Sequence, residues 1–160
     1  RQQACEPTER WAEFYVHQRV LPFAEKALKV GNVGGGGMDV VKQACDALLE
    51  EDEDAPLARI HGDLWAGNLL FGTEGPRFID PAAHGGHPLT DVAMLELFGA
   101  PHFSAIVDGY LDGGGELGRD WQRRIAVHQL HPLAVHAWTH GPSYGSVLVR
   151  AAEETLRVVG

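Results

Sequence analysis

The sequence predicts a mostly α-helical α+β fold with one small β-hairpin. Apolar residues recur at helical spacing over most of the 160 residues. Two short apolar runs, Leu69–Phe71 and Arg77–Ile79, flank the turn-like segment Gly72–Pro76, as the strands of a hairpin do. No run approaches about 18 uninterrupted apolar residues, so the sequence predicts no membrane-spanning helix.

The first third of the chain is expected to be helical. Helical spacing runs from Thr8, the expected N-cap, to about Leu28, and Pro22 should kink this segment or divide it in two. The glycine-rich residues 31–37 are expected to form a loop. A second helix should then run from about Asp39 to Leu49 before an acidic run ends it.

The last part of the chain, after the hairpin, is expected to be helical again. The predicted helices cover residues 90–98, 101–110, 120–138 and 145–158. Glycine- and proline-containing turns at 112–115 and 140–142 separate some of them. A chain of this length fits one domain with a sizeable core.

Composition limits the possible partners and the compartment. The net charge is −9 with neutral histidines, and no Lys/Arg cluster of nucleic-acid-binding size is present, so nucleic acid is not an expected partner. Cys5 and Cys45 form no CxxC pattern and are expected to be buried thiols, which suits a reducing cytoplasm. The first residues contain neither a methionine nor a signal peptide, so we expect part of a longer chain.

The hairpin predicts a metal site at its open end. We expect the pairing in which Phe71 faces Arg77, and continuing this register places Asn68 opposite Asp80. Directly opposed residues point to the same face, with Cβ atoms about 4.5–5.5 Å apart. An amide oxygen and a carboxylate at that separation suit Mg²⁺, which completes its coordination with water and phosphate oxygens.

The loop before the first hairpin strand supplies a candidate general base. Asp63 lies five residues before Asn68 and could accept a proton from an attacking hydroxyl. With His61 and Leu64, this spacing matches the kinase catalytic-loop signature H-R-D-L-x-x-x-N, except that glycine replaces arginine at position 62. A base aspartate, a metal-binding asparagine and a metal-binding aspartate recur in phosphoryl transfer by kinases.

Three tracts carry a likeness to a known family: HGDLWAGNLLF, FIDPA and GHPLTDVAMLELFG. They resemble the fructosamine kinase (ketosamine-3-kinase) family, which is related to aminoglycoside and choline kinases within the protein-kinase-like fold. Trp65 and the tract DVAMLELFG favour this family over aminoglycoside kinases, which usually have HGDLHPGN. A looser likeness extends from the helix around Trp11 to Tyr144–Gly145.

The resemblance implies ATP-dependent phosphorylation of a sugar hydroxyl on a ketosamine, which is a fructosamine or ribulosamine that is free or protein-bound. It implies Asp63 as the base, Asn68 and Asp80 as ligands of Mg²⁺ and contacts of ATP, and His61 and Asp91 as supports of the catalytic loop. The family often has aromatic residues between DPA and GH, where this chain has Ala83-His84-Gly85. The charged pair commonly seen after GH is also absent from His87–Thr90. Both departures bear on the substrate more than on the reaction.

A kinase-like enzyme also needs a glycine-rich phosphate loop and a strand lysine, both before the catalytic loop. The lysines that precede His61 lie in expected helices. Gly34–Gly37 is either a phosphate cradle or a mobile connector, and the connector is favoured because no strand leads into it. We therefore expect residues 1–160 to be a single kinase-like C-terminal lobe without the nucleotide-binding lobe, inactive by itself.

Several side chains keep two interpretations. Trp65 either lines the acceptor pocket or packs beneath the catalytic loop. His84 and His87 either contact substrate or are loop histidines satisfied by backbone groups. His136 and His140 have the i, i+4 spacing that can chelate zinc, but no HExxH glutamate is present, so local packing is favoured.

Two other functions also remain open. The acceptor could be an aminoglycoside, choline or another hydroxyl compound. The chain could also be a non-catalytic kinase-like module that binds a partner through its helical surface. The joint presence of Asp63, Asn68 and Asp80 argues against such a module.

Overall fold

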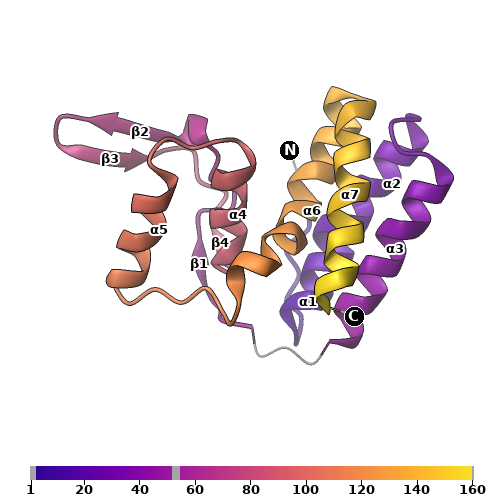
Figure 1. Cartoon of the computed structure of the whole chain (residues 1–160), viewed down its shortest axis with the longest axis horizontal. Coiled ribbons are helices and arrows are strands. Elements are labelled where there is room, and N and C mark those ends of the chain that lie inside the picture. Colours follow the sequence, from indigo (N-terminus) through magenta and orange to yellow (C-terminus); the bar gives the residue numbers. More distant parts are fainter. Residues whose placement is uncertain (1–2, 52–54, 160) are drawn as a thin grey trace. The chain divides into compact units, whose positions relative to one another are not determined.

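A computed structural model of the chain describes residues 3–51 and 55–159 (Figure 1). The chain forms two compact units, one made of Arg1–Glu53 with Ala126–Gly160 and one made of Asp54–Ile125. We call the first the helical unit and the second the hairpin unit. Among the helices of the described ranges, none has the length and apolar character needed to cross a bilayer.

The helical unit is a bundle in which α3 packs along α7 (Figure 1). Its elements in chain order are α1 (Trp11–Phe14), the π-helical segment η1 (Tyr15–Val20), α2 (Leu21–Lys29), α3 (Gly35–Glu50), the later part of α6 (Trp121–His140) and α7 (Pro142–Val159). Small and branched apolar side chains fill its interior, and they include Val16, Val20, Ala24, Ala27, Val41, Ala44, Leu148 and Ala152.

The first helical segment starts later than predicted. It begins at Trp11, and its N-cap Arg10 makes no capping hydrogen bond through its side chain. The expected N-cap, Thr8, is wrong because its hydroxyl donates to the Arg10 carbonyl instead. The six π-helical residues of η1 precede Pro22, which lies in the first turn of α2. The sequence predicted a kink or a division at Pro22. The chain stays helical from Trp11 to Lys29 and is not divided at the proline, but its hydrogen-bonding pattern changes in η1, just before Pro22.

Helix α3 begins inside the glycine run. Residues 31–34 form the predicted loop, but Gly35–Gly37 belong to the helix, so the loop prediction was too long. At Gly37, an added Cβ would lie 2.7 Å from Val149 Cγ2 in α7. Packing against α7 therefore outweighs the low helix propensity of glycine.

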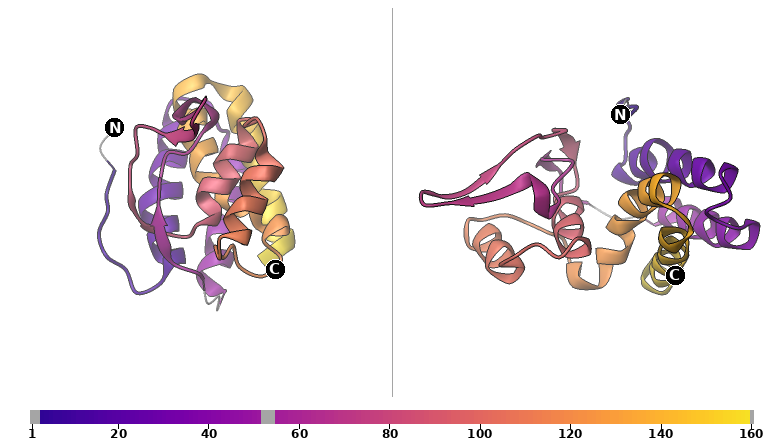
Figure 2. Two further views of the ribbon diagram at one scale, coloured as in Figure 1. Left: turned by 90° about the vertical axis from the view of Figure 1, so that its left-hand side faces the viewer. Right: turned by 90° about the horizontal axis from the view of Figure 1, so that it is seen from above.

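The hairpin unit combines two small antiparallel sheets with two helices and the first turn of a third. The right-hand view of Figure 2 shows its long hairpin most clearly. Its elements are β1 (Ala58–Ile60), the 3₁₀ turn η2 (Ala66–Asn68), β2 (Leu69–Gly72), β3 (Gly75–Phe78), β4 (His84–Gly86), α4 (Leu89–Leu97) and α5 (Phe103–Asp112). β1 pairs with β4, and β2 pairs with β3. The mostly helical α+β prediction is confirmed, and β4 is an addition that its sequence, HGG, did not indicate.

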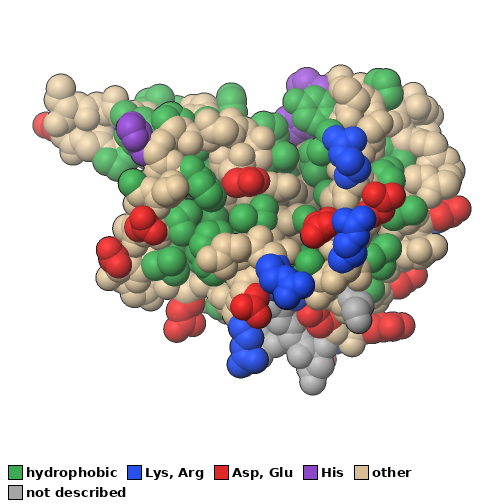
Figure 3. Space-filling view, viewed as in Figure 1, with side chains coloured by type: hydrophobic (Ala, Val, Ile, Leu, Met, Phe, Trp, Pro, Cys, Tyr) green, Lys and Arg blue, Asp and Glu red, His purple; other side chains and the backbone are tan. Residues whose placement is uncertain are grey.

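Helix α4 anchors the hairpin unit. Its Leu95 packs with Leu64 and Leu69, which lie in the loop after β1 and at the start of β2. Its Leu89 and Val92 belong to a second cluster with α5. Hydrophobic side chains gather on the face of the hairpin unit that Figure 3 shows. The large apolar side chains that this unit exposes are Leu57, Trp65, Leu70, Phe71, Phe78, Tyr110 and Leu111.

The two cysteines lie in different environments. Cys45 is fully buried in α3, and burial raises the pKa of its thiol to about 12. Cys5 is exposed in the segment before α1, so the prediction that it is buried was wrong. Its neighbours on either side are exposed too, because no helix forms before Trp11.

In the helical unit, Gly145 near the start of α7 lets that helix lie close to the backbone of Asn32, in the loop before α3. An added Cβ at Gly145 would lie 1.9 Å from the backbone oxygen of Asn32. Overpacking of this kind costs about 1–3 kcal/mol, and a carbonyl cannot rotate away as a side chain can. We therefore expect Gly145→Ala to lower the free energy of unfolding by about 2–3 kcal/mol in urea denaturation followed by circular dichroism.

Gly36→Ala is the matched control for this substitution. Gly36 also lies in a helix, but an added Cβ there would meet no atom within 4 Å. This control should be neutral or stabilising by up to about 1 kcal/mol, because alanine favours helix more than glycine does. Equal unfolding midpoints for the two variants would contradict the close approach.

Candidate functional site

The loop between β1 and β2 brings two of the predicted site residues together. Asn68 is buried at the end of the 3₁₀ turn, whereas Asp63 is exposed. The side-chain Nδ2 of Asn68 donates to the backbone oxygen of Asp63 at 2.8 Å and lies 3.4 Å from its carboxylate oxygen Oδ2. The loop thus holds an amide beside a solvent-accessible carboxylate.

The register of the hairpin differs from the prediction by one residue. Phe71 pairs with Pro76 instead of Arg77, because the chain turns over Thr73 and Glu74 alone. Gly75 has φ +108°, which permits this tight turn, and Pro76 occupies a strand position in a sheet that has only edge strands. The expected five-residue turn was therefore too long.

The predicted pairing of Asn68 with Asp80 across the strands is consequently wrong. The backbone oxygen of Asn68 accepts from the N–H of Ile79 at 3.0 Å, so Ile79 is its partner. Asp80 follows the end of β3, is exposed and has φ +51°, outside the extended conformation of a strand. Strand pairing therefore does not set Asn68 and Asp80 opposite each other.

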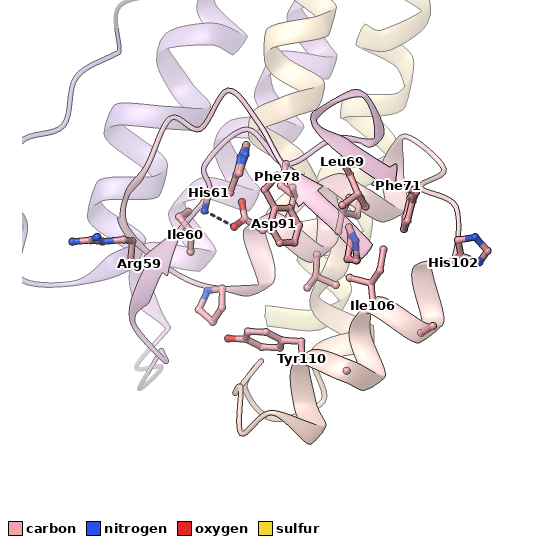
Figure 4. A pocket seen from close by; sticks show the side chains of 17 residues that line it. Arg59, Ile60, His61, Leu69, Phe71, Phe78, Asp91, His102, Ile106 and Tyr110 are labelled. Carbon is pink, nitrogen blue, oxygen red and sulfur yellow. Dashed lines mark hydrogen bonds between the residues drawn. The ribbon is translucent and has the colours of Figure 1, made fainter. Parts of the chain in front are cut away.

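Asp91 braces the start of the loop from the first turn of α4. Its Oδ2 accepts from the backbone N–H of His61 at 2.6 Å (Figure 4). Its Oδ1 accepts from the backbone N–H of Gly62 at 2.9 Å. Burial raises the pKa of this carboxyl above its ordinary value. The two backbone hydrogen bonds and the nearby imidazoles of His61 and His84 partly oppose that rise.

His61 joins the loop to the segment after the hairpin. Its Nε2 lies 2.9 Å from the backbone oxygen of Ile79, and because a carbonyl can only accept, the ring nitrogen donates. Its own carbonyl accepts from the N–H of Ala82 at 2.9 Å. The side chain and the backbone carbonyl of His61 therefore both connect the loop that carries Asp63 to the segment that carries Asp80.

The conformation of Gly62 explains why glycine stands at this position. Its φ is +80°, in the region that side-chain-bearing residues rarely adopt. A Cβ there would lie 2.4 Å from the carbonyl oxygen of Ala82 and 2.9 Å from the ring of His84. An arginine, as in the kinase signature, does not fit this backbone.

Trp65 packs on its own loop. An added Cβ at Gly67 would lie 2.2 Å from the Trp65 ring, so the indole covers the α-carbon of that glycine. The side chain stays 44% exposed. Trp65 thus both packs on Gly67 and keeps an exposed surface, so both interpretations of this side chain stay open.

The two histidines near β4 are both engaged with the backbone. His84, which is half-buried, has Nδ1 2.8 Å from the Ala82 oxygen. His87 is 1% exposed, and its Nδ1 accepts from the N–H of Leu89 at 3.1 Å. Burial, reinforced by the charge of Arg124, lowers the pKa of His87 to about 4. His87 therefore has the geometry of the backbone-satisfied alternative.

An apolar pocket of about 650 Å³ lies next to the braced loop, and sequence reasoning missed it (Figure 4). Its walls include Leu69, Phe71 and Phe78 of the hairpin and Ile106 and Tyr110 of α5. In the observed register, Leu69 opposes Phe78 and Phe71 opposes Pro76, so these residues share one face. A correct register would have revealed this apolar face from the sequence.

The histidines of α6 lie in the helical unit. The rings of His136 and His140 stack with centroids 4.8 Å apart, and His136 Nδ1 lies 2.8 Å from the Pro132 oxygen. No group of three or more His, Cys, Asp or Glu side chains in residues 3–51 and 55–159 is arranged to hold a metal ion.

Gly62→Ala tests the loop conformation. The substitution introduces both an unfavourable φ and a contact with the backbone of Ala82, and each costs about 1–3 kcal/mol. We expect a loss of at least about 2 kcal/mol in the free energy of unfolding. Gly85→Ala is the control, because an added Cβ at Gly85 meets no atom within 4 Å. A Gly62 variant as stable as the Gly85 variant would contradict the geometry.

The depressed pKa of His87 predicts a pH dependence of stability. Because its folded pKa, about 4, lies below the ordinary 6.5, the unfolded chain binds more protons between these values. Stability is therefore lost as pH falls from about 6.5 towards 4, and between pH 7 and pH 4.5 this loss amounts to about 2 kcal/mol.

His87→Asn isolates the contribution of the imidazole. Its amide oxygen can still accept from Leu89 but does not titrate. Urea denaturation at pH 7 and pH 4.5 should show a loss that is smaller by about 2 kcal/mol in the variant than in the original protein. Parallel losses in both proteins would show that His87 does not titrate with a depressed pKa.

Comparison with known proteins identifies the family of this chain. The model of the fructosamine kinase family matches residues 1–158. The chain is 33% identical over 150 residues to Probable ketoamine kinase YniA of Escherichia coli (strain K12), covering 94% of this chain and 50% of that protein. It is 30% identical over 133 residues to mouse ketosamine-3-kinase, covering 81% of this chain and 41% of that enzyme.

A solved structure gives the same result. The crystal structure of a protein from Thermobifida fusca, named as a candidate fructosamine-3-kinase, superposes with a TM-score of 0.88 at 43% identity. The match covers 97% of this chain and 54% of that one. The chain therefore spans about half the length of the relatives it matches. Because the family model matches nearly the whole sequence, the chain belongs to the fructosamine kinase family.

Proposed function

We propose that the protein containing this chain is an ATP-dependent kinase that phosphorylates a sugar hydroxyl of a ketosamine. The observation that carries this proposal is the contact between Asn68 and Asp63 on a loop held by Asp91. A general base and a metal-binding amide must be kept at a fixed separation for phosphoryl transfer. Family membership supports the same reaction.

Asp63 is the proposed general base. Its carboxylate is exposed, so an acceptor hydroxyl can approach it from solvent. Its backbone oxygen, rather than its carboxylate, makes the 2.8 Å bond to Asn68, and the carboxylate lies at 3.4 Å. The proton-accepting oxygens are thus positioned without being fully committed to a neighbour, which suits a base.

Asn68 and Asp80 are the proposed ligands of Mg²⁺ and, through it, of ATP. The Asn68 amide nitrogen is turned towards Asp63, so its oxygen is the atom left to bind a metal. Asp80 is exposed at the end of the hairpin, and both groups offer the hard oxygen donors that Mg²⁺ prefers. When bound, the ion would neutralise charge that develops on the phosphoryl oxygens.

We further propose that this chain is a kinase-like C-terminal lobe. The order of loop, hairpin and acid between His61 and Asp80 supports this assignment, as does the fold shared with the relatives. The glycine-rich loop and strand lysine would then lie outside these 160 residues, and the chain alone should bind ATP poorly.

We assign a fructosamine or ribulosamine, free or protein-bound, as the acceptor. Trp65 is a candidate contact, since it is part-exposed and lies two residues after Asp63. The free thiols Cys5 and Cys45 are compatible with a cytoplasmic enzyme.

Asp63→Asn in the full-length protein tests the proposed base. Turnover of ATP with fructosyl-lysine or ribulosyl-lysine should fall by about a hundredfold or more, because the amide cannot accept the hydroxyl proton. ATP binding, measured by calorimetry, should persist. Asp39→Asn is the control, since Asp39 is an exposed carboxylate of α3 in the helical unit.

The outcomes separate the competing functions. Unchanged turnover in the Asp63 variant would exclude it as the base. Turnover with an aminoglycoside but not with either ketosamine would change the acceptor class while keeping the chemistry. ATP turnover absent with every acceptor would favour a binding module over an enzyme.

A further inference from the structure

We propose that His84 is a positioning residue that holds the Asp80 segment against the loop carrying Asp63. The catalytic meaning of this role rests on the function proposed above, whereas the mechanical role stands on the contacts alone. His84 begins β4 and pairs with Ile60, the last residue of β1. It therefore lies beside the point where the chain enters the loop.

The imidazole of His84 is tied to Ala82. Its Nδ1 lies 2.8 Å from the Ala82 oxygen, and since the carbonyl can only accept, Nδ1 carries the donated proton. The N–H of Ala82 donates in turn to the carbonyl of His61 at 2.9 Å. Both backbone polar groups of Ala82 are thus engaged, one by the loop and the other by His84.

The ring of His84 also covers Gly62. A Cβ at Gly62 would lie 2.9 Å from both Cε1 and Nδ1 of the imidazole, so the ring occupies the space that a side chain would take. The absence of a side chain at Gly62 and the presence of the ring at His84 are complementary. The ring consequently touches the residue directly before Asp63.

These contacts connect the two acidic residues of the proposed site. Asp63 is covalently adjacent to Gly62, and Asp80 lies two residues before Ala82. His84 contacts both Gly62 and Ala82, so it restrains the distance between the backbone at Gly62 and the backbone at Ala82. The same imidazole favours the anionic form of Asp91, the brace of the loop. Loss of the His84 tie should loosen the Asp80 segment before it affects global stability.

Two variants in the full-length protein separate the hydrogen bond from the ring. His84→Asn keeps a donor close to the position of Nδ1, because its amide nitrogen replaces that atom, but it lacks the ring. His84→Phe keeps an aromatic ring but has no donor. His17→Asn and His17→Phe are matched controls at an exposed histidine of the helical unit.

Hydrogen exchange of peptides that cover residues 79–84 is the first measurement. We expect exchange in the Phe variant to be faster by about three- to tenfold than in the original protein, as for the loss of one hydrogen bond. The Asn variant should remain within about twofold, and peptides from α3 and α7 should not change. Both His17 variants should exchange as the original protein does.

The metal dependence of turnover is the second measurement. The Mg²⁺ concentration for half-maximal activity should rise in the Phe variant and be restored in the Asn variant, with little change in the KM for ketosamine. Unchanged exchange at 79–84 in the Phe variant would overturn the positioning role. An equal loss in both variants would overturn the assignment to the Nδ1 hydrogen bond.

The two measurements also separate this inference from the function on which it rests. If the original protein transfers no phosphate, the proposed function fails, but hydrogen exchange still decides whether His84 holds the segment. If turnover is present and the metal requirement of the Phe variant is unchanged, the kinase proposal survives and the catalytic meaning of the His84 contacts is rejected.

Discussion

The carboxylate of Asp91 is the constraint on which the candidate site depends. It accepts two consecutive backbone N–H groups, those of His61 and Gly62, from the first turn of α4. Consecutive N–H groups point to opposite sides of an extended strand, so their convergence on one carboxylate means that the chain turns as it leaves β1. Gly62 continues that turn with a φ of +80°. An anion is also favoured at the N-terminus of a helix, where the helix dipole is positive. The direction in which the loop leaves β1, and therefore the position of Asp63, follows from this interaction.

Short elements hold the site because they are linked to larger ones. A two-stranded sheet is marginally stable by itself, and the hairpin unit contains two of them. The β1–β4 pair is held by α4 through the Asp91 bonds, and the base of the hairpin is held where Leu69 packs with Leu64 and Leu95. Towards the turn, Leu70 and Phe71 of β2 stay about half exposed. The end of the hairpin nearest the loop is thus anchored, and the far end projects.

Sequence reasoning recovered features that depend on local pattern and missed those that depend on distant contacts. Helical periodicity predicted α4, α5, α6 and α7 to within three residues at their ends. The strands of the hairpin were also predicted, but their register requires knowing whether Pro76 belongs to the turn, and both assignments fit its conformational limits. β4 was missed because two of its three residues are glycine, and its pairing with β1 depends on contacts across the loop. The glycine at position 62, where the kinase signature has arginine, is explained only by the contacts of Ala82 and His84 against it.

The polar side chains of the site differ in their exposure to solvent, and each degree of exposure suits a different role. Asp91 is half-buried, and both of its carboxylate oxygens already accept backbone N–H groups of the loop, so its hydrogen bonds are used to hold the loop. Asn68 is buried but carries no charge, which lets it sit beneath Asp63 without the large desolvation penalty of a buried ion. Asp63 alone combines solvent exposure with attachment to the braced loop. A group that must exchange protons with a substrate has to remain accessible, whereas a group that fixes its position does not. Under the proposed function, the same loop therefore uses the carboxylate of Asp91 as its support and presents the carboxylate of Asp63 as the base.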